Sequence, residues 1–202
     1  MSRFVAYYRT RLSQVFGLLF LGVVMVSDKQ LGLVAPELTG ILFLIGCALA
    51  GIAVIGRLWC AQYIAGYKDN TLVAEGPYSM CRNPLYFFSF LGAVGVGLCT
   101  ESLYLTLFLI ISFGILYRSI IHTEEIKLKR IFGAPYENYL KTVPRFWPRL
   151  SLFHEPKHYE VVPSVFRHAV GDAIWFVIAI GIMELIEALQ ESGLLPMMFS
   201  IY

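Results

Sequence analysis

The sequence predicts an all-α membrane protein, a polytopic bundle of about five transmembrane helices in a single domain, residues 1–202. Of these residues 57% are hydrophobic and only 15% are charged, and the mean hydropathy is +0.67. Such values lie outside the usual range of soluble domains. The net charge is only +2, and no basic cluster is interleaved with residues that read bases, so we expect no nucleic-acid partner.

The first two predicted spans differ in strength. Residues 15–26 are apolar but short, and they are not followed by the small-residue cleavage site of a signal peptide, so we interpret them as a first span. Residues 38–56 carry no charge over a length that can cross a hydrocarbon core, and Pro36 and Arg57 bracket them.

The third and fourth predicted spans, residues 85–100 and 102–117, are separated only by Glu101. One continuous helix would place this carboxylate in the middle of the bilayer, so we expect a tight helical hairpin with Glu101 at the far surface. The fifth predicted span, residues 168–189, is an extra C-terminal span. We expect it to be anchored at its ends by acidic residues near the interfaces, namely Asp172, Glu184 and Glu187.

Basic residues alternate across this arrangement. Three arginines precede the first span, three basic residues lie between the second and third spans, nine lie between the fourth and fifth, and only Lys29 falls on the other side. This is the positive-inside pattern, and it predicts a cytoplasmic N-terminus. We expect the cytoplasmic membrane of a bacterium or archaeon rather than the endoplasmic reticulum. Two polar segments rich in rings and charges then share the cytoplasmic face.

The first polar segment is residues 76–86, with the sequence Gly-Pro-Tyr-Ser-Met-Cys-Arg-Asn-Pro-Leu-Tyr. Gly76 predicts a turn, and Pro84 is suited to the first position of the third span. Arg82 and Asn83 therefore lie at the positive end of a helix, where free amide groups favour an anionic ligand such as a carboxylate. The alternative is an arginine that snorkels to lipid phosphates and an asparagine that caps the helix.

The second polar segment is residues 124–148 and begins on a helix predicted over residues 118–132. At about 100° per residue this helix has one apolar face. Glu124 falls inside that face and Glu125 at its edge. The face is formed by Ile120, Ile121, Leu128, Ile131 and Phe132.

The two glutamates have different expected partners. Glu125 can pair with Lys129 one turn later, as an exposed helical contact. Glu124 faces apolar surroundings, where a carboxylate needs a cation such as a ligand ammonium. The alternative is a structural ion pair between Glu124 and an arginine of another segment, Arg82 or Arg145.

Gly133 is expected to end this helix. A proline-bracketed stretch of rings and basic groups follows. It can cover a flat heterocycle as a lid, or lie among the headgroups as an interfacial belt. The stretch comprises Tyr136, Tyr139, Pro144, Arg145, Phe146, Trp147 and Pro148.

An arginine for a carboxylate, a glutamate for an amine and aromatic rings for a purine together suit S-adenosylmethionine. Residues 71–148 also resemble the isoprenylcysteine carboxyl methyltransferase and phospholipid methyltransferase superfamily. The resemblance is carried by Gly76-Pro77-Tyr78, Arg82-Asn83-Pro84 with Tyr86, Glu124-Glu125, Phe132-Gly133, Tyr136, Tyr139 and Val143-Pro144-Arg145.

The resemblance implies that both polar segments bind S-adenosylmethionine at the cytoplasmic face, with S-adenosylhomocysteine as product. A lipid or lipidated substrate would enter from the bilayer. Arg82 and Glu124 are the expected catalytic residues. The expected cofactor-binding residues are Tyr78, Arg82, Asn83, Pro84, Tyr86, His122, Glu124, Glu125, Tyr136, Tyr139 and Arg145.

The chain departs from the family pattern at Asn83, where the family often has histidine, so this position is not expected to act as an acid or base. Gly95-Val96-Gly97 resembles a Gly-x-Gly element of phospholipid methyltransferases, but with Gly92 it favours a face of small residues for helix packing. No Gly-x-Gly-x-x-Gly follows a predicted strand, which excludes a soluble Rossmann-type methyltransferase.

The choice of methyl acceptor rests on proton chemistry. A carboxylate is already ionised at neutral pH, whereas an amine or thiol must lose a proton to a nearby acceptor. The two segments contain no histidine, and only His122, close before the glutamate pair, offers an imidazole there. We therefore favour a protein-S-isoprenylcysteine carboxyl O-methyltransferase over a phosphatidylethanolamine-type N-methyltransferase.

Three other functions are weighed against methyl transfer. The sequence His154-Glu155-Pro156-Lys157-His158 fits the His-Glu-x-x-His pattern of zinc proteases, but Pro156 interrupts the required helix, so no metal site is expected. A small transporter would require polar residues at mid-depth in several spans, and the predicted spans do not show them. A non-catalytic membrane scaffold would leave Glu124 without a role.

Overall fold

The computed structural model describes residues 17, 20–25, 27–29, 35–67, 71–195 and 199–201. Gly17 and residues 20–25, part of the predicted first span, are helical. The rest of that span and the arginines that precede it lie outside the described residues.

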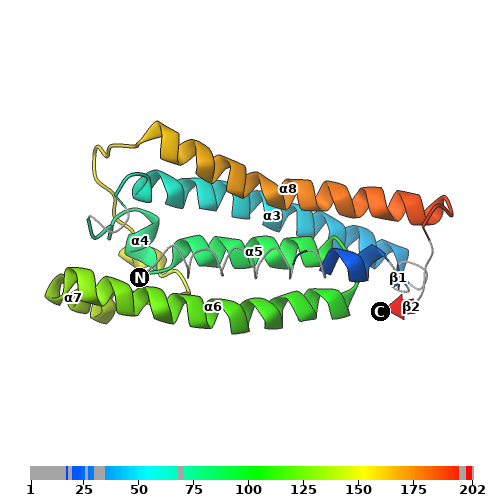
Figure 1. Cartoon of the computed structure of the whole chain (residues 1–202), viewed down its shortest axis with the longest axis horizontal. Coiled ribbons are helices and arrows are strands. Elements are labelled where there is room, and N and C mark those ends of the chain that lie inside the picture. The colour runs from blue at the N-terminus through cyan, green and yellow to red at the C-terminus, as the bar shows by residue number, and fades with distance from the viewer. Residues whose placement is uncertain are drawn as a thin grey trace.

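The described chain is almost entirely helical, with four helices lying side by side along the long axis of the molecule (Figure 1). The helices are α3 (Pro36–Ile64), α4 (Pro77–Met80), α5 (Pro84–Leu98), α6 (Leu103–Phe132), α7 (Ala134–Thr142) and α8 (Pro163–Glu191), with a 3-10 turn η1 (Leu150–Leu152). Two three-residue strands, β1 (Ser27–Lys29) and β2 (Phe199–Ile201), pair in parallel.

Three of these helices, α3, α6 and α8, are long and apolar enough to cross a membrane, and α5 is a shorter apolar helix. The predicted all-α membrane bundle is therefore confirmed. The predicted fourth span and the helix predicted over residues 118–132 form one continuous helix, α6, which ends at Gly133. At 1.5 Å per residue α5 spans about 22 Å, which is less than a typical hydrocarbon core.

Helix α5 contacts its neighbours through glycines. A Cβ atom built on Gly92 would lie 2.4 Å from the Phe176 ring of α8, one on Gly95 would lie 2.6 Å from a backbone oxygen of α3, and one on Gly97 would lie 3.0 Å from Thr106 of α6. Three glycines on one short helix thus face three different helices. The interpretation of these residues as a packing face is confirmed.

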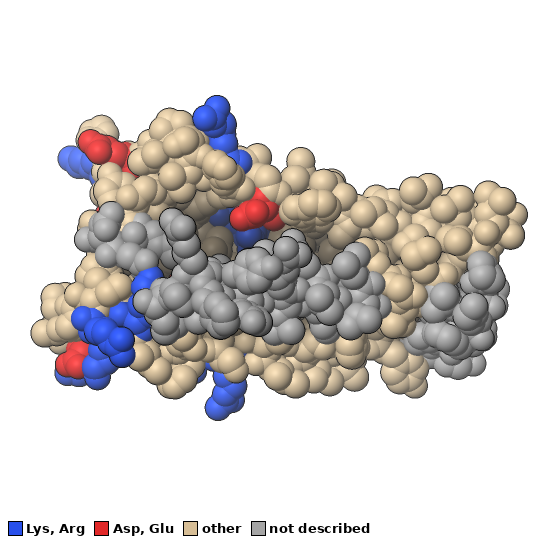
Figure 2. Space-filling view, viewed as in Figure 1, with Lys and Arg blue, Asp and Glu red and all other residues tan. Residues whose placement is uncertain are grey.

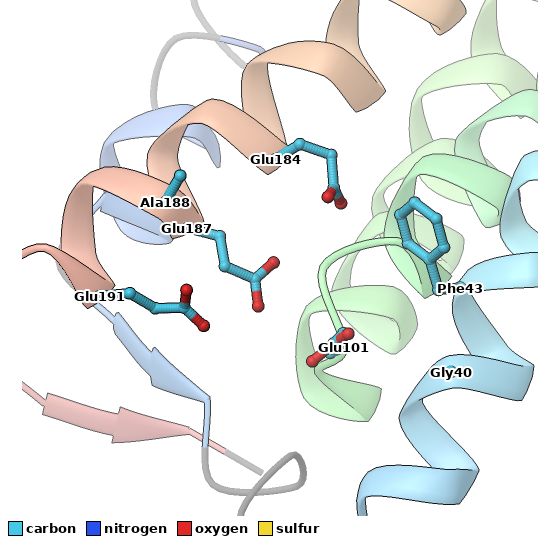
Figure 3. A pocket seen from close by; sticks show the side chains of 7 residues that line it. All are labelled: Gly40, Phe43, Glu101, Glu184, Glu187, Ala188 and Glu191. Carbon is cyan, nitrogen blue, oxygen red and sulfur yellow. The ribbon is translucent and has the colours of Figure 1, made fainter.

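The predicted hairpin between α5 and α6 is also confirmed. Glu101 lies in the turn with a positive φ of 56°, and Ser102 caps α6 by accepting a hydrogen bond from the Leu105 amide at 3.3 Å. Beside this turn lies a cavity of about 340 Å³. Figure 3 shows Glu184, Glu187 and Glu191 of α8 on one side of it and Glu101 on the other.

This cavity lies at the opposite end of α5 from the two polar segments, which meet where α4 and α7 lie together (Figure 1). Its charged lining is acidic only, and it contains none of the predicted site residues. It is therefore separate from the candidate site described next.

Candidate functional site

The first polar segment is shaped by its glycine and prolines. Gly76 adopts a positive φ of 58°, in close contact with the Tyr63 ring, and Pro77 begins the single turn of α4. Pro84 then begins α5, as predicted. Asn83 occupies the N-cap position, but its side chain makes no cap and instead donates to the Arg145 carbonyl oxygen at 2.9 Å. The capping interpretation of Asn83 is therefore wrong, and its side-chain amide instead links the start of α5 to the loop after α7.

An ion cluster joins the two polar segments. One oxygen of Glu125 lies 3.1 Å from Arg82 Nη2, and the other lies 3.1 Å from Arg145 Nη2. The Glu125 side chain is only 16% exposed. A largely buried carboxylate between two guanidinium groups is stabilised by charge-assisted interactions with both of them. Loss of either partner would leave a buried charge without compensation.

The prediction that Glu125 pairs with Lys129 is wrong. Lys129 instead pairs with Glu137 of α7 at 2.9 Å, and both of those side chains are about half exposed. The sharp turn at Gly133 folds α7 back so that Glu137 reaches Lys129, while Glu125 faces the start of α5. Arg82 and Arg145 were considered as partners of Glu124. In the structure both of them pair with Glu125.

Arg82 also holds the loop after α7. Its Nη1 donates to the Leu140 carbonyl oxygen at 2.6 Å and to that of Val143 at 3.3 Å, and its backbone amide donates to the Pro144 carbonyl oxygen at 2.9 Å. The Arg82 side chain is 12% exposed. It therefore fixes the second segment against the first and does not snorkel along the membrane surface.

Glu124 accepts a hydrogen bond from the Tyr86 hydroxyl of α5 at 2.7 Å. The Tyr86 ring meets Tyr117 edge-on with 5.2 Å between centroids, and Tyr117 stacks on Phe113 at 3.8 Å. Glu124 thus lies at the polar end of a column of rings between α5 and α6. Tyr86, expected from the resemblance alone, contacts the glutamate of the other segment directly.

The remaining rings divide into two groups. Tyr136 and Tyr139 are buried, with 1% and 8% of their surface exposed, and the Tyr139 hydroxyl donates to the Tyr78 carbonyl oxygen at 2.6 Å. Phe146 and Trp147 contact the rings of α5, and Trp147 is 67% exposed. Tyr136 and Tyr139 therefore support the site from within, and Trp147 is the ring of this stretch that presents a large free surface.

Two polar atoms of the ion cluster have no hydrogen-bond partner among the described residues although they are buried. They are Nε of Arg82 and Nε of Arg145; Nη2 of each arginine is held by Glu125. A buried donor without a partner costs about 1–3 kcal/mol, more where it is charged. Guanidinium N–H groups left over in this way fit the carboxylate of an amino-acid ligand.

Burial also controls the phenols. It raises the pKa of Tyr136 to about 12, helped by the Glu125 carboxylate, and it raises the pKa values of Tyr139 and Tyr78 well above their ordinary value. All three phenols are therefore protonated hydrogen-bond donors at neutral pH.

The Tyr136 phenol gives a testable pH dependence. Its raised pKa stabilises the fold below the ordinary phenol value near 10, and this contribution disappears as the pH rises from about 10 to about 12. Thermal unfolding in detergent should therefore show a smaller loss of Tm between about pH 9 and about pH 11 for Tyr136→Phe than for the unmodified chain. Tyr104→Phe, at a 62% exposed position, is the control and should behave like the unmodified chain. Equal alkaline losses in all three proteins would contradict the prediction.

His122 is exposed on α6 and makes none of these contacts within the described part of the chain. Residues 149–154 form a strap across the first polar segment, which was not predicted from the sequence. The Arg149 amide donates to the Met80 carbonyl oxygen at 3.0 Å, the Gly76 amide to that of His154 at 2.8 Å, and the His154 amide to Ser79 Oγ at 3.1 Å. Two of these bonds join backbone groups, which leave no signal in a side-chain pattern. His154 and His158 lie in a non-helical stretch of this region.

Comparison with known proteins covers the same residues. Residues 37–135 match the model of the phospholipid methyltransferase family. The protein-S-isoprenylcysteine O-methyltransferase of Schizosaccharomyces pombe is 35% identical over 77 residues, which is 38% of this chain and 33% of that protein. The chain belongs to the isoprenylcysteine carboxyl methyltransferase and phospholipid methyltransferase superfamily.

Two further proteins are similar to this chain over a greater length. The cobalt-zinc-cadmium resistance protein CzcN of Cupriavidus metallidurans is 39% identical over 155 residues, 77% of this chain and 71% of that protein. The nickel-cobalt-cadmium resistance protein NccN of Alcaligenes xylosoxydans xylosoxydans is 39% identical over 155 residues, 77% of this chain and 72% of that protein. No solved structure matches the chain at a significant level. The family match includes Arg82, Glu124 and Glu125 and ends before Arg145.

Proposed function

We propose that this chain is an integral membrane methyltransferase that uses S-adenosylmethionine and methylates a lipophilic acceptor from the bilayer. The ion cluster of Arg82, Glu125 and Arg145 supports this proposal most, because the buried Nε groups of its two arginines have no hydrogen-bond partner among the described residues. A second carboxylate, Glu124, is the neighbour of Glu125 in the sequence. Membership of a methyltransferase superfamily agrees with it. We place the site at the cytoplasmic face of a bacterial or archaeal membrane, with the N-terminus cytoplasmic.

The chain's own residues would act by binding and positioning. When bound, S-adenosylmethionine supplies a methyl group on a positively charged sulfur. Arg145 would donate from its free N–H groups to the ligand carboxylate, and Glu124 would accept from the ligand ammonium while Tyr86 holds one of its oxygens. Arg82 would keep this end closed through the loop after α7. Orientation and removal of water are the main contributions needed for an in-line displacement.

Binding of the product S-adenosylhomocysteine tests the proposal. We expect saturable binding by calorimetry to the protein in detergent, and binding at least about tenfold weaker for Glu124→Gln, since a charge-assisted hydrogen bond contributes about 1.5–3 kcal/mol. Glu137→Gln, on the exposed surface of α7, is the matched control and should bind like the unmodified chain. Equal affinity of the Glu124→Gln and Arg82→Lys variants and the unmodified chain would show that the site assignment is wrong.

The acceptor class remains to be chosen within the proposal. We favour a carboxylate of the S-isoprenylcysteine type, because a carboxylate needs no base and the exposed His122 contacts no other site residue among those described. The family match over residues 37–135 favours a phospholipid amine as second candidate. Transfer of a radiolabelled methyl group into membrane extracts separates the two, because alkali releases methanol from a methyl ester and leaves an N-methyl group intact.

The names of CzcN and NccN concern resistance to metals. Within the described residues no group of three or more His, Cys, Asp or Glu side chains is arranged to hold a metal ion. A non-catalytic scaffold or a small transporter is the remaining alternative for the chain. Either would fail to bind S-adenosylhomocysteine, so the calorimetric experiment also separates these classes.

A further inference from the structure

Arg57 is a charged residue of α3 that the site described above does not use. It lies seven residues before the end of the helix, about 10 Å along its axis. A charged side chain this far inside an apolar helix is costly and marks a functional position more often than a structural one. An arginine in such a position usually avoids this cost by extending its side chain along the helix toward the lipid headgroups.

Arg57 is not arranged in that way. Its Nη1 donates to Ser89 Oγ of α5, and its Cζ lies 5.7 Å from the centre of the Phe176 ring of α8. Ser89 is only 4% exposed and donates in turn to the Leu85 carbonyl oxygen at 2.7 Å. The guanidinium is therefore turned sideways, into the junction of α3, α5 and α8.

The charge of Arg57 is not neutralised in this junction. Among the described residues no carboxylate oxygen lies within 4 Å of its nitrogens, and its buried Nε has no hydrogen-bond partner. Ser89 and Phe176 are both neutral. Arg82 and Arg145, by contrast, share the carboxylate of Glu125. A partly buried, oriented guanidinium with an unused donor fits an oxyanion.

The junction lies close to the candidate site along α5. Ser89 is five residues beyond Pro84, which corresponds to about 7.5 Å along the helix from the end where Arg82 lies. Figure 2 shows that charged side chains are sparse along the flank of the molecule and gather toward one of its ends. An amphiphile that enters from the bilayer can thus place its polar end between the junction and the ion cluster.

We propose that Arg57 binds the anionic group, a carboxylate or phosphate, of the lipophilic methyl acceptor. The guanidinium holds the oxyanion through N–H groups that Ser89 does not use, while Ser89 fixes its orientation. Arg57 then selects acceptors whose headgroup carries a negative charge, and it has no part in holding S-adenosylmethionine. This inference rests on the proposed function for the identity of the acceptor.

Equilibrium binding tests this role without requiring turnover. The probes are a radiolabelled S-prenylcysteine, its carboxamide and phosphatidylethanolamine, each in neutral detergent with the purified full-length protein. We expect the carboxylate or the phospholipid to bind the unmodified chain about 10- to 100-fold more tightly than the carboxamide. Arg57→Gln should remove that preference, and Arg57→Lys should restore part of it. Whichever anionic probe loses affinity identifies the source of the oxyanion.

Arg167→Gln, at an exposed position near the start of α8, is the control for a general loss of positive charge. Calorimetry should give Arg57→Gln an unchanged affinity for S-adenosylhomocysteine. If the unmodified chain fails to bind that product, the proposed function fails, while the preference for the anionic probe still decides the role of Arg57. Equal affinity of the acid, the carboxamide and the phospholipid for the unmodified chain would overturn the inference. An equal loss in Arg167→Gln would also overturn it, because that result would show nonspecific attraction of lipid.

Discussion

Glu125→Gln is expected to lower the thermal unfolding midpoint more than any other change to a charged residue of the site, and to abolish binding of S-adenosylhomocysteine. The substitution leaves Arg82 and Arg145 facing each other without the carboxylate that separates them. Removing one partner of a largely buried ion pair costs about 3–5 kcal/mol, because the remaining charges lose their compensation. Circular dichroism during heating in detergent measures the first effect, and calorimetry measures the second.

The chain contains its own matched control for this change. Glu137→Gln breaks the ion pair with Lys129, whose geometry is as close, at 2.9 Å, but whose side chains are 58% and 47% exposed. An exposed pair contributes about 0–1 kcal/mol, so this variant should unfold nearly as the unmodified chain does.

A double variant tests whether the loss of stability in Glu125→Gln comes from uncompensated positive charge. Glu125→Gln combined with Arg145→Gln removes one positive charge together with the negative one. It should recover part of the lost stability while still failing to bind the product. Equal effects of Glu125→Gln and Glu137→Gln would contradict the view that the ion cluster holds the two polar segments together.

The parts of the fold that the sequence predicted correctly are those set by composition along a single helix. Glu101 required a turn, because a carboxylate in mid-bilayer is costly, and the turn lies there with a positive φ. Gly133 ends α6 because a positive φ is readily adopted only by glycine. Both features depend on neighbours in the sequence.

The pairing of charges could not be predicted in the same way. The spacing of Glu125 and Lys129 satisfies the rule for contacts one turn apart, and both residues nevertheless pair elsewhere. Which carboxylate meets which arginine depends on how the loop after α7 folds back onto the start of α5. That loop is fixed by backbone carbonyl groups, Leu140 and Val143 on Arg82 and Arg145 on Asn83, and every residue type carries such a group.

The continuity of α6 was not predicted, although its apolar part and its polar part were each expected to be helical. Hydropathy separates an apolar run from a polar one, but a helix does not end where hydropathy changes. α6 continues through this boundary, so Tyr117 in its apolar part and Glu124 in its polar part lie on one continuous helix. As a result Tyr86 of α5 contacts both of them.

The second large effect is expected from Gly95→Ala, which should destabilise the protein although it adds only one methyl group. The new Cβ would lie 2.6 Å from the Gly46 carbonyl oxygen and 2.9 Å from the Ala50 amide nitrogen, both on α3. Neither neighbour is a flexible side chain, so α3 and α5 must move apart along their most extensive contact. Overpacking of this kind costs about 1–3 kcal/mol. The Tm in detergent should fall accordingly.

Gly51→Ala is the matched control for this change, since Gly51 lies in the same pair of helices and a Cβ there meets nothing within 4 Å. Replacing a helical glycine by alanine stabilises a helix by about 0.5–1 kcal/mol where there is room, so its Tm should be unchanged or slightly higher. If Gly95→Ala lowers the Tm and Gly51→Ala does not, the loss is due to the close approach of α3 and α5 and not to helix propensity. The close packing of α3 and α5 also positions the start of α5 at Pro84, next to Arg82, and brings Ser89 to Arg57. Gly95→Ala should therefore also weaken S-adenosylhomocysteine binding. Equal Tm changes in both variants would show that α5 is not held by its glycines.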